Sequence, residues 1–148
     1  MSLPVEPDFA LIKFGDGATP TEVFTIACGI QDITVNIAVN TNDRFVRDCA
    51  KPGEVPYRKV KASGKQMDVT ATGLIDKAQL TTYHASAGVV GNFKIEYYQD
   101  DGTDAGDLLG TYAVAAMLTS INQGVPRENT ASVELNLASH GAWTWTAA

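Results

Sequence analysis

Four aspartates stand close together between residues 100 and 107, and they are the first group in this chain that could do chemistry. They are Asp100, Asp101, Asp104 and Asp107. Carboxylate oxygens are the ligands that Ca²⁺ prefers. The spacing departs from the EF-hand loop, because the third position is Gly102 and the sixth is Ala105. The pattern favours a turn between two strands, with calcium binding as the alternative.

The histidines and cysteines do not form a catalytic or metal-binding pattern. His84 and His140 are far apart, and neither has a metal ligand three or four residues away. Cys28 and Cys49 lie in no motif typical of a thiol nucleophile, and we expect both thiols to be reduced. The glycine-containing stretch 15–17 lacks the Lys and the helix of a phosphate loop. We therefore expect no enzymatic activity, no metal and no cofactor.

A basic segment over residues 41–65 is the strongest signal. It holds seven of the eleven Lys and Arg residues. Its two prolines disfavour a helix or a central strand, and its aromatic residues stand among charges, as interface anchors do. We predict a loop of 25 residues that reaches another molecule, with a solvated mobile loop as the alternative. The candidate contact residues are Arg44, Phe45, Arg47, Pro52, Pro56, Tyr57, Arg58 and Lys61.

Composition and charge narrow the class of protein. A chain of 148 residues with 45% hydrophobic and 19% charged residues is typical of one globular domain. The formal net charge is −6, and outside the basic segment the chain is strongly acidic, which disfavours tight binding of nucleic acid. Because no apolar run approaches 18 residues and residues 1–8 carry no basic side chain, we expect neither a secreted nor a membrane-spanning product.

Two alternating segments flank the basic segment. In residues 31–40 and 66–72, apolar and polar side chains alternate, which is typical of half-buried strands. The pair predicts a wide antiparallel hairpin with a protruding tip. The polar side of this hairpin consists of Asp32, Thr34, Asn36, Gln66, Asp68, Thr70 and Thr72.

The rest of the chain is predicted to be mostly strand. The spacing favours a helix over residues 74–86, which ends before Gly88, whereas residues 108–121 are compatible with helix or strand. Residues 139–141 predict a turn between the last two strands. The other predicted strands are 9–14, 23–26, 93–98, 132–137 and 143–146.

The order of these parts resembles the tail tube (major tail) proteins of long-tailed bacteriophages. The resemblance lies in the opening hairpin, the long strand, the charged loop, the return strand over 69–76 with its short helix, and the closing pattern over 131–145. It covers nearly the whole chain through its layout. It implies a mainly β fold in a single domain over residues 1–148, with β-sandwich or barrel-like sheets, one flanking helix and a long protruding hairpin loop.

The same resemblance implies a structural virion protein. Such proteins form hexameric rings that stack into a hollow tube, through which DNA passes without tight binding. The basic loop would contact the adjacent ring, and the polar side of the hairpin would line the lumen. The implied partners are further copies of the chain and tail proteins such as the tape measure, the tail terminator and the baseplate or distal tail protein, with no membrane. Assembly would occur in the cytoplasm of the host bacterium.

A β-sandwich binding or adhesion module is the alternative function. Trp143 and Trp145 share one face of the last predicted strand and could stack on sugar rings, although packing in a core or interface is the commoner use of such residues. A sibling in the same fold family, such as a tail terminator or a secretion-system tube, is a further alternative.

Overall fold

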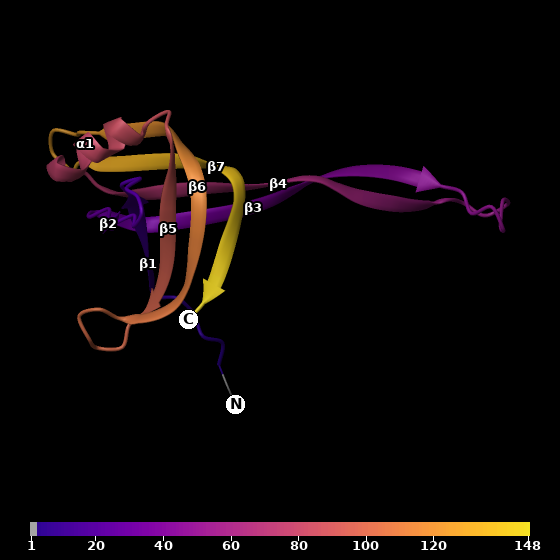
Figure 1. Ribbon diagram of the computed structural model, residues 1–148, viewed down its shortest axis with the longest axis horizontal. Coiled ribbons are helices and arrows are strands. Elements are labelled where there is room, and N and C mark those ends of the chain that lie inside the picture. The colour runs from indigo at the N-terminus through magenta and orange to yellow at the C-terminus, as the bar shows by residue number, and fades with distance from the viewer. Residues whose placement is uncertain (1–2) are drawn as a thin grey trace.

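The computed structural model describes residues 3–148 and is mainly β, as the sequence predicts (Figure 1). All seven strands form one antiparallel sheet in the order β2-β1-β5-β6-β7-β4-β3. The elements are β1 (Phe9–Gly15), β2 (Phe24–Ile26), β3 (Ile30–Val46), β4 (Tyr57–Leu74), α1 (Lys77–Ser86), β5 (Val90–Gln99), β6 (Asp107–Gly124) and β7 (Ser132–Ala147).

The sheet folds over on itself because β6 and β7 each belong to two halves. The first part of β6 pairs with β5 and with the end of β7, whereas its last part pairs with the start of β7, which in turn pairs with β4. Register shifts between Val114 and Ala116 and between Leu118 and Ser120 mark the bend. Figure 1 shows the strands of the two halves crossing steeply, so the result is sandwich-like.

The core lies between the two halves. Apolar side chains alternate with polar ones along each strand, and the apolar set faces inward. Phe14 packs edge-on against Phe93, with ring centroids 4.8 Å apart, and meets Tyr83 of α1 at 5.6 Å. The helix therefore contributes one large aromatic side chain to the core. The largest fully buried side chains are Tyr83, Ile12, Met67, Ile95, Leu118, Leu135 and Val133.

The predicted loop over residues 41–65 is wrong for most of its length. β3 continues to Val46 and β4 begins at Tyr57, so only residues 47–56 connect the two strands. Figure 1 shows this hairpin projecting far from the body. Because neither face of the projecting part is covered, its sequence lacks the apolar alternation that reveals a half-buried strand. We call residues 41–62, beyond the register shift at Asn40 and Thr41, the arm.

Three other predictions are changed or settled by the structure. The turn over 139–141 is wrong, because β7 runs unbroken through it and Gly141, with φ of 83°, lies within the strand. Residues 108–121 are strand. The helix begins at Lys77 rather than 74, since the carboxylate of Asp76 caps it by accepting from the backbone N–H of Ala78.

Within the described residues, no helix is long and apolar enough to cross a membrane.

Candidate assembly surfaces

The polar side chains predicted on the central hairpin lie on one face of the sheet. Cross-strand register places Asp32 opposite Thr72, Thr34 opposite Thr70, and Asn36 opposite Asp68. Gln66 lies opposite Ala38 on the same face and donates a hydrogen bond to Asp68 at 3.1 Å. Side chains directly opposite each other share a face, so the structure brings all seven predicted residues together.

This polar face continues onto β7 and β6, which the sequence analysis did not include. Thr70 lies opposite Asn136, which in turn lies opposite Ser120. In the next row, Thr72 lies opposite Glu134, which lies opposite Asn122. The alternation over residues 132–137 was visible, but only the strand order shows which strands lie beside β4. We call the combined face the polar wall. It consists of Asp32, Thr34, Asn36, Gln66, Asp68, Thr70, Thr72, Ser120, Asn122, Glu134 and Asn136.

The chemistry of the polar wall is that of a surface to which polyanions do not adhere. Three of its residues are carboxylic acids, and none of the eleven is Lys or Arg. Phosphate groups are held by clustered cations, which the wall lacks, and its acids repel them. The wall therefore offers hydrogen-bonding groups but no anion-binding site.

The arm separates its charges onto two faces. Arg44 lies opposite Lys59, and Lys61 opposite Asn42, on one face. The other face carries Phe45 and Arg58, which lie opposite each other, and the Arg58 guanidinium is 4.0 Å from the carboxylate of Asp43. Both predicted aromatic anchors are exposed, Phe45 at 70% and Tyr57 at 80%. An exposed aromatic group on a projecting ribbon is suited to contact with another molecule.

Arg47 is engaged within the tip of the arm. One guanidinium nitrogen, Nη1, donates to the carbonyl oxygens of Pro52 at 2.8 Å and Glu54 at 2.9 Å. These bonds close the turn of residues 47–56, in which Pro52 and Pro56 both lie. Arg47 thus orders the tip, and its predicted contact with another molecule stays a prediction.

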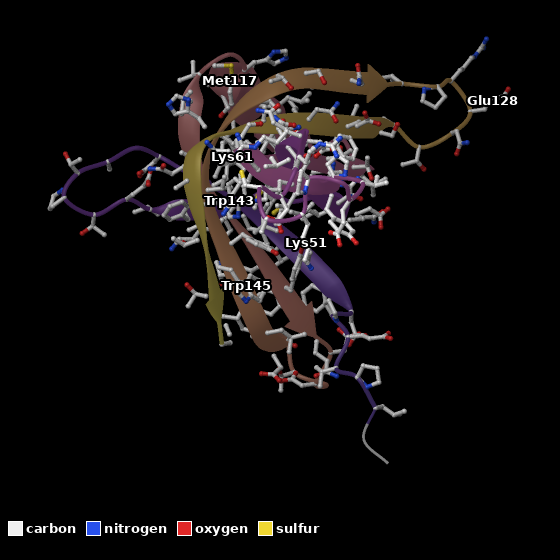
Figure 2. The ribbon with its side chains drawn as sticks, turned by 90° about the vertical axis from the view of Figure 1, so that its right-hand side faces the viewer. Lys51, Lys61, Met117, Glu128, Trp143 and Trp145 are labelled. Atoms are coloured by element: carbon white, nitrogen blue, oxygen red, sulfur yellow. The ribbon has the colours of Figure 1, made fainter. Side chains whose placement is uncertain are left out.

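The two tryptophans lie on the final part of β7, as Figure 2 shows. Trp145 contacts Tyr112, with ring centroids 4.7 Å apart, and Tyr97, at 6.0 Å. It also covers Gly110, where an added Cβ would clash with its ring. The indole of Trp145 is 47% exposed, but these neighbours occupy one side of it. The arrangement is one of packing against the sheet.

Asp101 stabilises the turn formed by residues 100–107. The carboxylate of Asp101 accepts from the hydroxyl and the backbone N–H of Thr103, and these bonds lower the pKa of Asp101 below its ordinary value. The carboxylate of Asp8 accepts from the N–H of Asp100. Over residues 3–148, no three His, Cys, Asp or Glu side chains are grouped to hold a metal ion. Both cysteines are free and exposed.

Comparison with known proteins gives structural matches only, since no family model and no curated protein sequence matches the chain. A chain from the tail of an empty gene transfer agent particle, solved with C6 symmetry, has a TM-score of 0.65 and 20% identity over 93% of this chain and 95% of that chain. A chain from the sheath-tube complex of an extracellular contractile injection system has a TM-score of 0.65 and 16% identity, over 98% and 93%. The SPP1 tail tube has a TM-score of 0.59 and 11% identity, over 98% and 80%.

The chain has the tail tube fold. This confirms the fold predicted from the layout of the sequence, including the single flanking helix and the long hairpin. The three matches cover 93–98% of the chain.

Proposed function

We propose that this chain is a structural subunit of a hollow tail tube, built from rings of identical copies that stack along one axis. The observation that carries the proposal is the polar wall. Its side chains are uncharged or acidic, and it extends over four strands of which the two outer ones have free edges. The fold shared with tube proteins of gene transfer agents, phages and contractile injection systems supports it.

The open sides of the polar wall explain how a ring would close. Among the described residues, β3 pairs only with β4, and β6 beyond Leu118, which forms a single bridge to Ala87, pairs only with β7, so each presents a free edge. β4 and β7 lie between these two strands, and all neighbours are antiparallel, so β3 runs opposite to β6. The β3 edge of one copy can therefore pair with the β6 edge of the next in an antiparallel ladder. Repetition around an axis would join the walls into a closed barrel, and six copies agree with the C6 symmetry of the related tail.

The joined walls would form the lumen. Asp32, Asp68 and Glu134 would repeat in every copy and give the channel an acidic lining. Double-stranded DNA is a dense polyanion, so such a lining lets it pass without being held. This is the reason for placing the wall inside the tube and the other half of the sheet outside.

Stacking would rest on the arm. An arm that projects from one end of a subunit meets the next ring, and a contact between different surfaces of identical copies does not close on itself, which produces a filament. The copies would also meet the proteins that start and end such a tube, including a tape measure, a terminator and a distal tail or baseplate protein. The role is structural, with assembly in the host bacterial cytoplasm and a final place in the virion.

Electron microscopy of the purified full chain tests the proposal. Rings or hollow filaments are expected for the natural chain, and dispersed monomers at high concentration would contradict the proposal. A variant without the arm removes residues 43–61 and joins Asn42 to Ala62 through an added Asn-Gly, so that Thr41 stays opposite Ala62 and a three-residue loop with Gly at its end closes the hairpin. This variant should fold, because the body of the subunit keeps its core. It should form no long tubes, because it lacks the arm. Tubes of unchanged length from it would contradict the role of the arm.

A further inference from the structure

Three cations on one face of the arm have no ion-pair partner among the described residues. Arg44, Lys59 and Lys61 form what we call the basic strip. Over residues 3–148, the ion pairs join Lys13 to Glu96, Lys51 to Glu54 and Arg58 to Asp43, and none includes the strip. Arg44 and Lys59 lie directly opposite each other, and like charges in such positions destabilise a two-stranded ribbon.

The other cations around the tip do not share this property. Arg58 is near Asp43 on the opposite face, Lys51 is 3.9 Å from Glu54, and Arg47 donates to backbone carbonyls. The subunit therefore leaves unneutralised the charges that repel one another most directly. An anionic group from another molecule would relieve that repulsion, so the basic strip points to an acidic partner.

The subunit also carries an acidic surface, on the side away from the arm. The loop between β5 and β6, residues 100–106, together with Asp107 at the start of β6, contains four aspartates and no Lys or Arg. All four are exposed. Figure 1 shows this loop on the side of the body away from the arm, along the longest axis of the molecule. We call residues 100–107 the acidic loop.

We propose that the basic strip of one copy docks on the acidic loop of the copy in the next ring. The inference rests on the proposed stacking and names the two surfaces that would make it. Opposite charges at opposite ends of one chain favour head-to-tail association and fix its direction. A protein partner suits this face better than a nucleic acid does, because Val46 and Tyr57 continue it toward the tip with exposed apolar groups.

Reciprocal charge reversal in the full chain tests the docking. Lys59→Glu places a carboxylate opposite Arg44, so the arm itself loses a repulsion, yet the concentration needed for tube formation should rise about tenfold. Asp104→Lys should have the same effect from the other side. The double variant Lys59→Glu with Asp104→Lys should recover much of the loss, because opposite charges meet again. Light scattering and electron microscopy give the readout.

Two matched controls change net charge by the same amount elsewhere. The first control is Lys77→Glu, at the start of α1. The second is Glu128→Lys, at the tip of the β6–β7 loop (Figure 2). Both residues are exposed, and each control should stay within about twofold of the natural chain. Controls as impaired as the test variants would overturn the docking, since net charge alone would then explain the effect.

The remaining outcomes separate the docking from the proposed function. Failure of the natural chain to form rings or tubes would overturn both. Normal tubes from the single variants, or no recovery in the double variant, would overturn the docking alone. Binding of a short DNA duplex by the natural chain that Lys59→Glu abolishes, with tube formation unchanged, would show that the strip serves nucleic acid and would overturn the docking as well.

Discussion

Thr70 and Asn136 face each other across β4 and β7, and the hydroxyl Oγ1 of Thr70 donates to Oδ1 of Asn136 at 3.1 Å. The amide Nδ2 of Asn136 donates to Oγ of Ser120 at 2.7 Å and to Oε1 of Glu134 at 3.2 Å. One amide thus accepts from β4 and donates to β6 and to its own strand. Because an amide has both donors and acceptors, Asn136 connects three strands of the polar wall as neither acid nor base could.

Asn136→Asp should therefore destabilise the subunit without altering its shape. The carboxylate has no donor for Glu134 and adds a like charge beside it. We expect the free energy of unfolding to fall by about 1–2 kcal/mol at neutral pH, and by less in acid, where the carboxylates are protonated. Urea denaturation measures this. Asn122→Asp is the control, because the 3.5 Å bond from Asn122 to Glu134 is weak and exposed; an equal loss there would contradict the connecting role of Asn136.

Tyr83→Phe should leave the subunit equally stable or more stable. The side chain of Tyr83 is 1% exposed, and its hydroxyl has no hydrogen-bond partner among the described residues. Burial is the main cause that raises the pKa of Tyr83 to about 12. Phenylalanine keeps the ring against Phe14 and removes the unsatisfied polar atom, which is worth about 1 kcal/mol. A clear loss of stability in thermal and urea unfolding would indicate that the hydroxyl is satisfied.

Tyr98 should make the subunit lose stability in alkali. Its hydroxyl donates to Glu96 at 2.8 Å, and burial together with this bond raises the pKa of Tyr98 to about 12 from 10.0. Between these two values the unfolded chain loses the proton while the folded chain keeps it. The contribution is therefore complete below pH 10 and is lost as the pH rises toward about 12.

The measurement is urea unfolding across that alkaline range. Tyr98→Phe should be less stable than the natural chain at neutral pH, because the bond to Glu96 is lost, and its stability should depend less steeply on pH above 10. Tyr57→Phe is the matched control, since Tyr57 is 80% exposed and should leave the slope unchanged. Identical slopes for Tyr98→Phe and the natural chain would refute the linkage.

The sequence predicts those strands whose two faces meet different surroundings. Ile33 and Val35 face the core side and Asp32 and Thr34 the other side, so residues 31–40 alternate visibly. Neither face of the arm is covered. Its two strand segments, which begin at Thr41 on β3 and end at Ala62 on β4, contain charged residues but no alternation of apolar and polar side chains. The same limit applies to the polar wall, because Asn136 joins it only through a strand order that local pattern does not contain.

The closing turn shows a different limit. Residues 139–141 have the composition of a turn, and Gly141 does adopt a positive φ of 83°. The positive φ lies inside β7, near the part of β6 where the register shifts. A glycine that ends a strand and one that lies within a bent strand have the same local sequence, and only pairing with a neighbouring strand distinguishes them.

Thr34→Lys tests whether the polar wall lines the channel. Thr34 lies on β3 between Asp32 and Asn36, opposite Thr70, and is exposed in the single subunit. One lysine per copy would repeat around every ring and convert a surface that repels phosphate into one that attracts it. Tubes should still form, and a short DNA duplex should sediment with them at least about tenfold more than with natural tubes at low salt. Thr144→Lys is the control, because Thr144 is also exposed but lies opposite Ala113 on the other half of the sheet. If both variants retain DNA equally, the wall has no special access to the channel, and the tube must be lined by another face.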